Sequence, residues 1–77
     1  MRVEVDIVIE AADGRIAGVE VKAGATVRSR DFNGLRHLAS RVGDGFAAGT
    51  VLYTGREPLS FGDRLWALPI SALWETN

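Results

Sequence analysis

The chain has 77 residues, of which 47% are hydrophobic and 25% are charged, and this composition fits one small globular domain spanning residues 1–77. It has no cysteine and only one histidine, which excludes disulfides, thiolate metal sites and zinc sites built from histidines, and leaves oxygen ligands as the only basis for a metal site. The net charge of −1 disfavours a protein that wraps duplex DNA, and the lack of a signal peptide or a span of ~20 apolar residues favours a cytoplasmic location.

Two short strands joined by a tight turn are predicted at the start of the chain. Residues 3–9 alternate between apolar and polar side chains, and residues 16–22 do the same, which is typical of half-buried strands. The intervening Ala12-Asp13-Gly14 suits a type I turn followed by a glycine in the left-handed conformation. Such a loop pairs Ala11 with Arg15 and so fixes the register of both strands.

The predicted register brings acids and a lysine together on the polar face of the hairpin. Counting back from the loop sets Asp6 opposite Glu20 and Glu4 opposite Lys22. Like charges directly opposite in a sheet repel by roughly 0.2 to 1 kcal/mol, and a divalent cation between Asp6 and Glu20 would reverse that sign. The alternative is that these are ordinary exposed strand carboxylates, with Lys22 forming a surface ion pair with Glu4.

A helix is predicted after the hairpin. Ser29 or Asp31 can cap its start and Gly43 ends it, and its apolar residues recur at helical spacing as Phe32, Leu35, Leu38, Ala39 and Val42. Gly34 costs about 1 kcal/mol in a helix interior relative to alanine. We therefore expect Gly34 to mark close packing of the helix on the sheet.

Three more segments complete the predicted sheet. Residues 50–53 form a continuous apolar run, typical of a central strand buried on both faces. Residues 59–61 are a candidate edge segment, residues 65–68 are a last strand that Pro69 ends, and residues 71–74 can form one helical turn. The order strand, strand, helix, strand, strand predicts an α/β fold, a small mixed β-sheet with one main helix crossing one face.

Several segments of the chain resemble a known family. Asp6 on one strand, followed by Glu20-Val21-Lys22 on the next, is similar to the site of the PD-(D/E)xK nuclease superfamily, which is an aspartate and then an acid, any residue and a lysine. More closely, residues 3–74 resemble the C-terminal nuclease-like domain of bacterial and archaeal AAA-type ATPases. The segments that carry this resemblance are Glu-Val-Asp-Ile-Val-Ile-Glu, Gly-Val-Glu-Val-Lys-Ala, Asp-Phe-Asn-Gly-Leu-Arg, Val-Leu-Tyr-Thr-Gly and Leu-Pro-Ile-Ser-Ala-Leu-Trp.

The resemblance implies a restriction-endonuclease-like core and metal-dependent hydrolysis of phosphodiesters in DNA or RNA. Asp6 and Glu20 would hold Mg²⁺ or Mn²⁺ with help from the backbone carbonyl of Val21, and Lys22 would orient the attacking water or neutralise the phosphate. The leading helix that often supplies another acid is missing, as is the ATPase loop Gly-x-x-x-x-Gly-Lys-Ser/Thr. We therefore expect either a free-standing domain or part of a longer protein.

A rival interpretation is an inactive nuclease-like fold kept as a binding or assembly module, attached to an ATPase partner or separate from one. The weak net charge and the small surface of a 77-residue monomer favour it. A free-standing regulatory role has no direct support in the sequence.

A basic segment follows the predicted site. Between residues 22 and 41, five lysine and arginine residues face one acid, Asp31, which gives a local charge of +4. This predicts a surface that guides nucleic-acid phosphates, for which the candidate residues are Arg28, Arg30, Arg36 and Arg41. The alternative is an ordinary solvated helix face. His37 lies opposite the apolar stripe, so we expect a solvated histidine and not a general base.

The C-terminal stretch is apolar. Residues 65–74 include Trp66 and Trp74, which can stack on bases but more often close a core or a subunit interface. One helix and a small sheet have little surface to cover both rings. We therefore predict a homo-oligomer, most simply a dimer.

Overall fold

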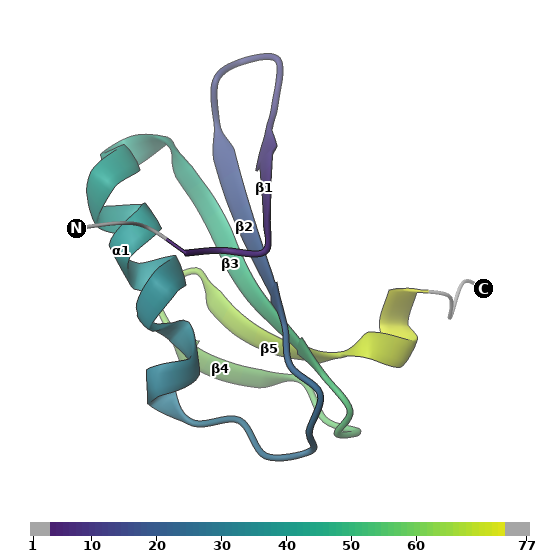
Figure 1. Ribbon diagram of the computed structural model, residues 1–77. Helices are drawn as coiled ribbons and strands as arrows, with labels where there is room; N and C mark the ends of the chain where they lie inside the picture. Colours follow the sequence, from purple (N-terminus) through teal and green to yellow (C-terminus); the bar gives the residue numbers. More distant parts are fainter. Residues whose placement is uncertain (1–3, 74–77) are drawn as a thin grey trace.

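The computed structural model describes residues 4–73, which form a five-stranded sheet with one α-helix on one side (Figure 1). The sheet order is β1-β2-β3-β5-β4. Its strands are β1 (Ile7–Glu10), β2 (Ile16–Val21), β3 (Phe46–Tyr53), β4 (Leu59–Gly62) and β5 (Leu65–Pro69). The helical segments are η1 (Ser29–Phe32), α1 (Asn33–Val42), η2 (Gly43–Gly45) and η3 (Ile70–Leu73).

The sheet is mixed, which confirms the predicted α/β class. β2, β3 and β5 run parallel, while β1 and β4 are antiparallel strands at the two edges. The connection from β2 to β3 passes through α1, as parallel neighbours require a crossover. The candidate edge segment at residues 59–61 is therefore a true edge strand, and β3 is the central strand.

The core lies between α1 and the sheet, and the apolar stripe predicted on the helix is confirmed. Phe32 and Leu35 are fully buried, and Phe32 stacks on Phe61 with 4.6 Å between the ring centroids. From the sheet, Phe46 and Val51 are buried against them. Full burial of side chains of this size contributes about 1.5 to 3 kcal/mol each to folding, so these residues hold the two layers together.

Several predicted boundaries are wrong by a few residues. The first strand begins at Ile7 and not at residue 3, because the chain bends at Asp6. The central strand begins at Phe46, four residues earlier than predicted, since small residues precede its β-branched run. The last strand extends one residue further than predicted, because Pro69 is itself part of β5 and pairs with Tyr53 at the strand end, where its missing N–H is tolerated.

The segment before β1 crosses α1, and this explains Gly34. A Cβ at Gly34 would collide with the carbonyl oxygen of Glu4 and would lie 3.7 Å from Val5 Cγ2. The close packing predicted from Gly34 is therefore real, but its partner is the segment leading into β1 and not the sheet.

The alternation predicted for the hairpin is correct. However, α1 does not cover the face of the hairpin that carries Ile7 and Ile9, but the opposite face. A Cβ at Gly18 would lie 2.7 Å from Leu35 Cδ2 and 2.9 Å from Leu38 Cδ2, so Gly18 faces α1. The alternate residues of both strands point away from the helix. As a result Ile7 and Ile9 are not half buried in the core but remain 49% and 54% exposed.

Candidate metal and phosphate site

The register of the β1–β2 hairpin is the one that the loop predicts. The Ala11 N–H donates to the Arg15 carbonyl over 2.8 Å, and Gly14 takes φ +91°. The ladder then pairs Glu10 with Ile16 through to Ile7 with Val19. One step further along the same register, at the end of the ladder, lie Asp6 and Glu20.

Asp6 and Glu20 face each other across the hairpin. Each carboxylate accepts a hydrogen bond from a backbone N–H on the opposite side of the hairpin. The Asp6 N–H donates to Glu20 Oε1 over 2.7 Å, and the Val21 N–H donates to Asp6 Oδ2 over 2.8 Å. These bonds between a charged acceptor and a backbone N–H continue the contact between the two strands past the bend that ends β1. The two acids are thus placed together without relying on a cation.

Each of these acids keeps one carboxylate oxygen that accepts no hydrogen bond within residues 4–73, namely Asp6 Oδ1 and Glu20 Oε2. Mg²⁺ is commonly held by one or two carboxylates together with waters and substrate phosphates. The donor set therefore fits a hard divalent ion that keeps most of its waters. Among the described residues no group of three histidine, cysteine, aspartate or glutamate side chains could hold a metal.

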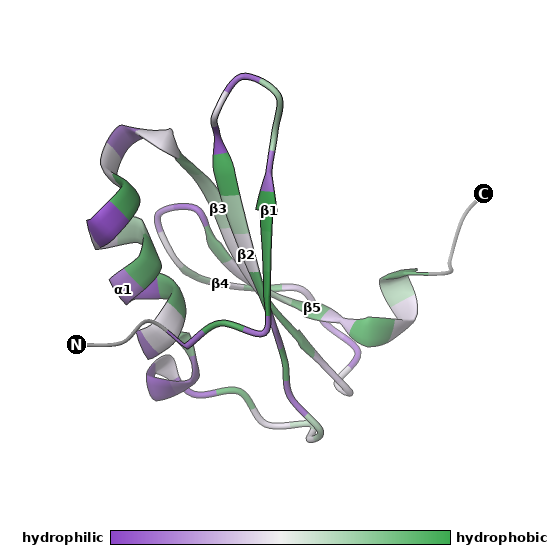
Figure 2. Ribbon diagram, turned by 45° about the horizontal axis from the view of Figure 1, so that its top comes forward, coloured by the Kyte–Doolittle hydropathy of each residue, from purple (hydrophilic) through white to green (hydrophobic). Residues whose placement is uncertain are grey.

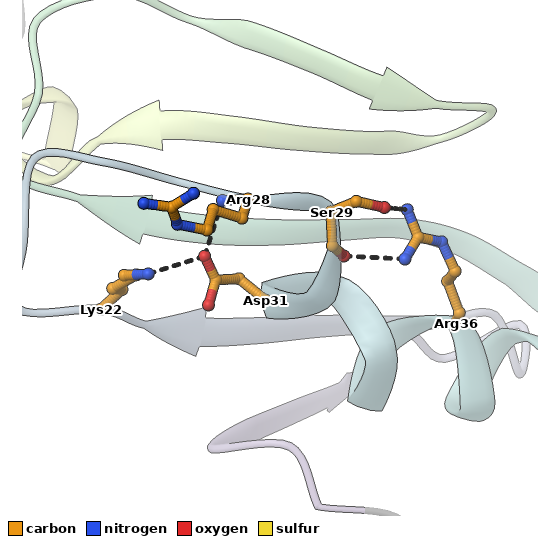
Figure 3. A network of polar contacts seen from close by, with 5 residues as sticks. All are labelled: Lys22, Arg28, Ser29, Asp31 and Arg36. Carbon is orange, nitrogen blue, oxygen red and sulfur yellow. Dashed lines mark hydrogen bonds and ion pairs between the residues drawn. The ribbon is translucent and has the colours of Figure 1, made fainter.

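Lys22 follows Glu20 on the same strand face, but its ammonium group is bound to Asp31 (Figure 3). The Lys22 Nζ lies 2.7 Å from Asp31 Oδ2, and the two side chains are 32% and 20% exposed. The Arg28 N–H donates to the same oxygen over 2.7 Å. The Lys22 hydrogen bond, followed by the Arg28 backbone bond, holds the pKa of Asp31 below its ordinary value.

Asp31 is the residue at this site that sequence reasoning missed. The sequence suggested it only as a helix cap, and it does cap the first turn: the Asp31 N–H donates to the Arg28 carbonyl while its side chain accepts from Arg28. Its second role, as the ion partner of Lys22, joins the end of β2 to η1. The available signal was that Asp31 is the only acid between residues 22 and 41.

The four candidate arginines are spread along the chain from the residue before η1 to the last turn of α1. Arg36 donates to the Ser29 carbonyl over 2.8 Å and to Ser29 Oγ over 2.9 Å, and its guanidinium lies 5.9 Å from the centroid of the Phe32 ring (Figure 3). Arg28 and Arg30 are exposed beside it at η1. Arg41 lies five residues beyond Arg36, about 7.5 Å further along the helix axis.

The other singled-out side chains lie apart from the acid pair. His37 is on α1 and partly exposed, and Tyr53 of β3 donates its hydroxyl to the Glu57 carbonyl. Trp66 is 44% exposed on β5. Trp74 lies outside the described residues.

Nothing in residues 4–73 forms a helix long and apolar enough to cross a membrane.

Comparisons with curated proteins and with solved structures gave no match. A family model described as "Domain of unknown function (DUF4143)" matches residues 1–73. Domains of this family are found in AAA-ATPase-associated proteins, in agreement with the coarser part of the resemblance. Because the match spans nearly the whole sequence, the chain belongs to the DUF4143 family.

Proposed function

We propose that this DUF4143 chain is a nuclease-like domain of PD-(D/E)xK type that hydrolyses phosphodiesters in DNA or RNA with Mg²⁺ or Mn²⁺. The observation that carries the proposal is the pairing of Asp6 with Glu20, each with one carboxylate oxygen left over from backbone hydrogen bonding. Carboxylate oxygens are the ligands that hard divalent ions such as Mg²⁺ and Mn²⁺ prefer.

Each residue of the site has a distinct role in this proposal. Asp6 and Glu20 are the metal ligands, with the Val21 backbone carbonyl as a further oxygen donor. When bound, the metal supplies Lewis-acid polarisation of the phosphate and a water of lowered pKa. Lys22, two residues after Glu20, provides a compact positive charge for the phosphate or the attacking water once it leaves Asp31.

The proposal extends to partners and place. The exposed Arg28 and Arg30 beside Lys22 offer positive charge to a nucleic-acid backbone, with Arg36 and Arg41 further along the helix. An AAA-type ATPase is the expected protein partner, the chain acts as a homodimer, and we place it in the cytoplasm.

The second candidate function is a binding or assembly module without chemistry. It is favoured by the fact that the site residues already have structural partners: the acids hold β1 to β2, and Lys22 holds β2 to η1 through Asp31. A site retained for its hydrogen bonds would keep these contacts and show no response to metal.

Thermal melting with and without metal tests the acid pair. Millimolar Mg²⁺ or Mn²⁺ should raise the Tm of the wild-type chain, because an ion that binds only the folded state stabilises it by mass action. Asp6→Asn should abolish most of this rise, while its amide oxygen can still accept the Val21 N–H. Asp44→Asn, an exposed aspartate after α1, is the matched control and should behave as wild type. Equal metal responses in all three proteins would reject the site.

Cleavage of plasmid and single-stranded DNA or RNA at low salt tests the chemistry. Turnover should require Mg²⁺ or Mn²⁺ and stop with chelator, and Lys22→Ala should lower it by about 100-fold, a typical loss for one charge-stabilising group. His37→Ala should be nearly silent. Metal binding without cleavage by the wild-type chain would favour the binding module, and equal cleavage by wild type and Lys22→Ala would indicate a contaminating nuclease.

A further inference from the structure

The sheet face that points away from α1 is mostly apolar at its strand positions, with Thr50 and Ser60 as polar but uncharged exceptions. Gly18 of β2 and Gly49 of β3 both face the helix, since a Cβ on either would lie within 3.3 Å of a Leu35 side-chain atom. Because side chains alternate along a strand, the residues next to Gly18 on β2 and next to Gly49 on β3 point away from the helix. No strand residue on this second face is charged, and we call it the open face; it includes Ile7, Ile9, Val19, Val21, Thr50 and Trp66.

The described chain covers the open face only in part: Leu52 of β3 is buried there at 8% exposure, while other side chains of the face stay exposed. Ile9 is 54%, Val21 48% and Trp66 44% exposed. Figures 1 and 2 place α1 on the other side of the sheet and η3 beyond the end of β5, so neither lies over β1 and β2. A contiguous apolar patch of this kind on a small domain marks a contact surface.

The directions of the strands also indicate that the open face is a contact surface. β3 has parallel neighbours on both sides, β2 and β5. All-parallel sheets have both faces covered, and the parallel centre of this mixed sheet shares their near-continuous apolar runs, whereas a solvated sheet face alternates polar residues outward. The open face has the composition of a covered face, with Ala17 opposite Ala48 and Val21 opposite Leu52.

We propose that a second copy of this chain covers the open face, by sheet-on-sheet packing about a two-fold axis. This deepens the homodimer proposed above by assigning its surface, and it is independent of metal chemistry. Five strands about 4.8 Å apart and some five residues long span about 400 Å² in projection. Because the accessible area of rough side chains exceeds their projection, the face provides at least about half of the ~800 Å² per partner of a standard interface.

The composition of the face suits a copy of itself. A two-fold axis brings residues near the axis against their own copies, so any charge there would meet a like charge. An axis parallel to the strands through β3 sets β5 of one copy over β2 of the other, in the aligned packing typical of stacked sheets. The bulky Trp66 then lies over the smaller Val19 of the second copy, and Thr50 meets Thr50.

Light scattering or sedimentation on the full chain at up to about 100 µM, well above the Kd of a modest interface, tests the assignment with a matched pair of variants. Ile9→Lys puts a charge on the open face. Val8→Lys puts the same charge on the adjacent residue of β1, which is equally exposed at 51% but points to the helix side. We expect a dimer for wild type and Val8→Lys, and at least a tenfold weaker dimer for Ile9→Lys.

A folded Ile9→Lys monomer, checked by circular dichroism, would support the open face. As a second measure, the chain lacks cysteine, so Thr50→Cys introduces a single thiol that a short bis-maleimide should link between copies, while Ser40→Cys on α1 should not link. A monomeric wild type at ~100 µM would overturn both the dimer and its surface. A dimer weakened equally by both lysine variants would keep the dimer but replace the open face by pairing along the β1 edge.

Discussion

At the scale of single residues, Asp31 joins two parts of the fold through one carboxylate oxygen. That oxygen accepts from Lys22 Nζ at the end of β2 and from the Arg28 N–H at the start of η1, both at 2.7 Å. A charged acceptor makes both bonds stronger than neutral ones. The Asp31 side chain thereby holds the two ends of the segment between β2 and η1 close to each other.

The stability contributed by Asp31 should depend on pH. Its pKa is lower in the folded chain than in the unfolded chain, so its contribution is complete above about pH 4 and is lost as the pH falls through the folded pKa. Because the pair is partly exposed, we expect Asp31→Asn to cost about 1 kcal/mol at pH 7, or a Tm lower by about 4 to 8 °C. The gap to wild type should narrow as the pH falls below about 4, the ordinary pKa of an aspartate. A gap that stays constant across this range would show that Asp31 acts without its charge.

At the scale of elements, the segment before β1 lies across α1 and is locked there by close contact. Gly34 presents no side chain, so the Glu4 carbonyl and the Val5 side chain reach the helix backbone. The contact places the bend at Asp6, and that bend in turn directs the Asp6 carboxylate to Val21. The acid pair thus depends on a helix glycine that it does not touch.

Gly34→Ala should destabilise the chain although alanine is the better helix former. The change gains about 1 kcal/mol of helix propensity, but the added Cβ meets the Glu4 carbonyl, and overpacking of this kind costs about 1 to 3 kcal/mol. We expect a net loss seen as a lower Tm, and a weaker metal response if the acid pair shifts. Ser40→Ala, exposed on the same helix, is the control and should change stability by less than about 0.5 kcal/mol. A higher Tm for Gly34→Ala would show that the segment before β1 can move away from the added Cβ at little cost in free energy.

The hairpin also shows what a sequence can and cannot predict. Period-2 alternation and a loop ending in Gly14 are local, so the register and the meeting of Asp6 with Glu20 could be predicted before the fold was seen. The face that α1 covers could not, because the helix packs where Gly18 leaves room and glycine does not count as apolar in a pattern.

Lys22 illustrates the same limit at the site. Cross-strand counting placed it opposite Glu4, but its ion partner Asp31 arrives from η1 through the tertiary fold, which no spacing rule connects to β2. The helix stripe, by contrast, follows from a local period and was predicted correctly down to Phe32, Leu35 and Leu38.

At the scale of the whole molecule, the sheet consists of two antiparallel strand pairs joined by one central strand. β1 pairs with β2 and β4 with β5 between neighbours in sequence, while β3 pairs in parallel with β2 and β5. Most of the buried sheet residues belong to β3 and β5, and these pack under α1. The edges are therefore held mainly by local contacts and the centre by long-range ones.

Amide hydrogen exchange should follow this division. Amides of β3, bonded on both sides under the core, should exchange only through global unfolding, whereas those of the exposed β1 should exchange through local opening. Dimerisation through the open face should slow exchange in β1 as the protein concentration rises, since exposure there falls. Equal protection of β1 and β3 in the dilute chain would contradict this division.

The position of β3 also sets the order in which the chain can assemble. Each outer hairpin can close within microseconds from residues near one another in sequence, but neither has a hydrophobic core of its own. Only when α1 has formed can the crossover deliver β3 between them, and that single insertion creates both parallel pairs and the core at once. The insertion should therefore limit the folding rate, so that substitutions in β3 slow folding while substitutions in β1 mainly speed unfolding.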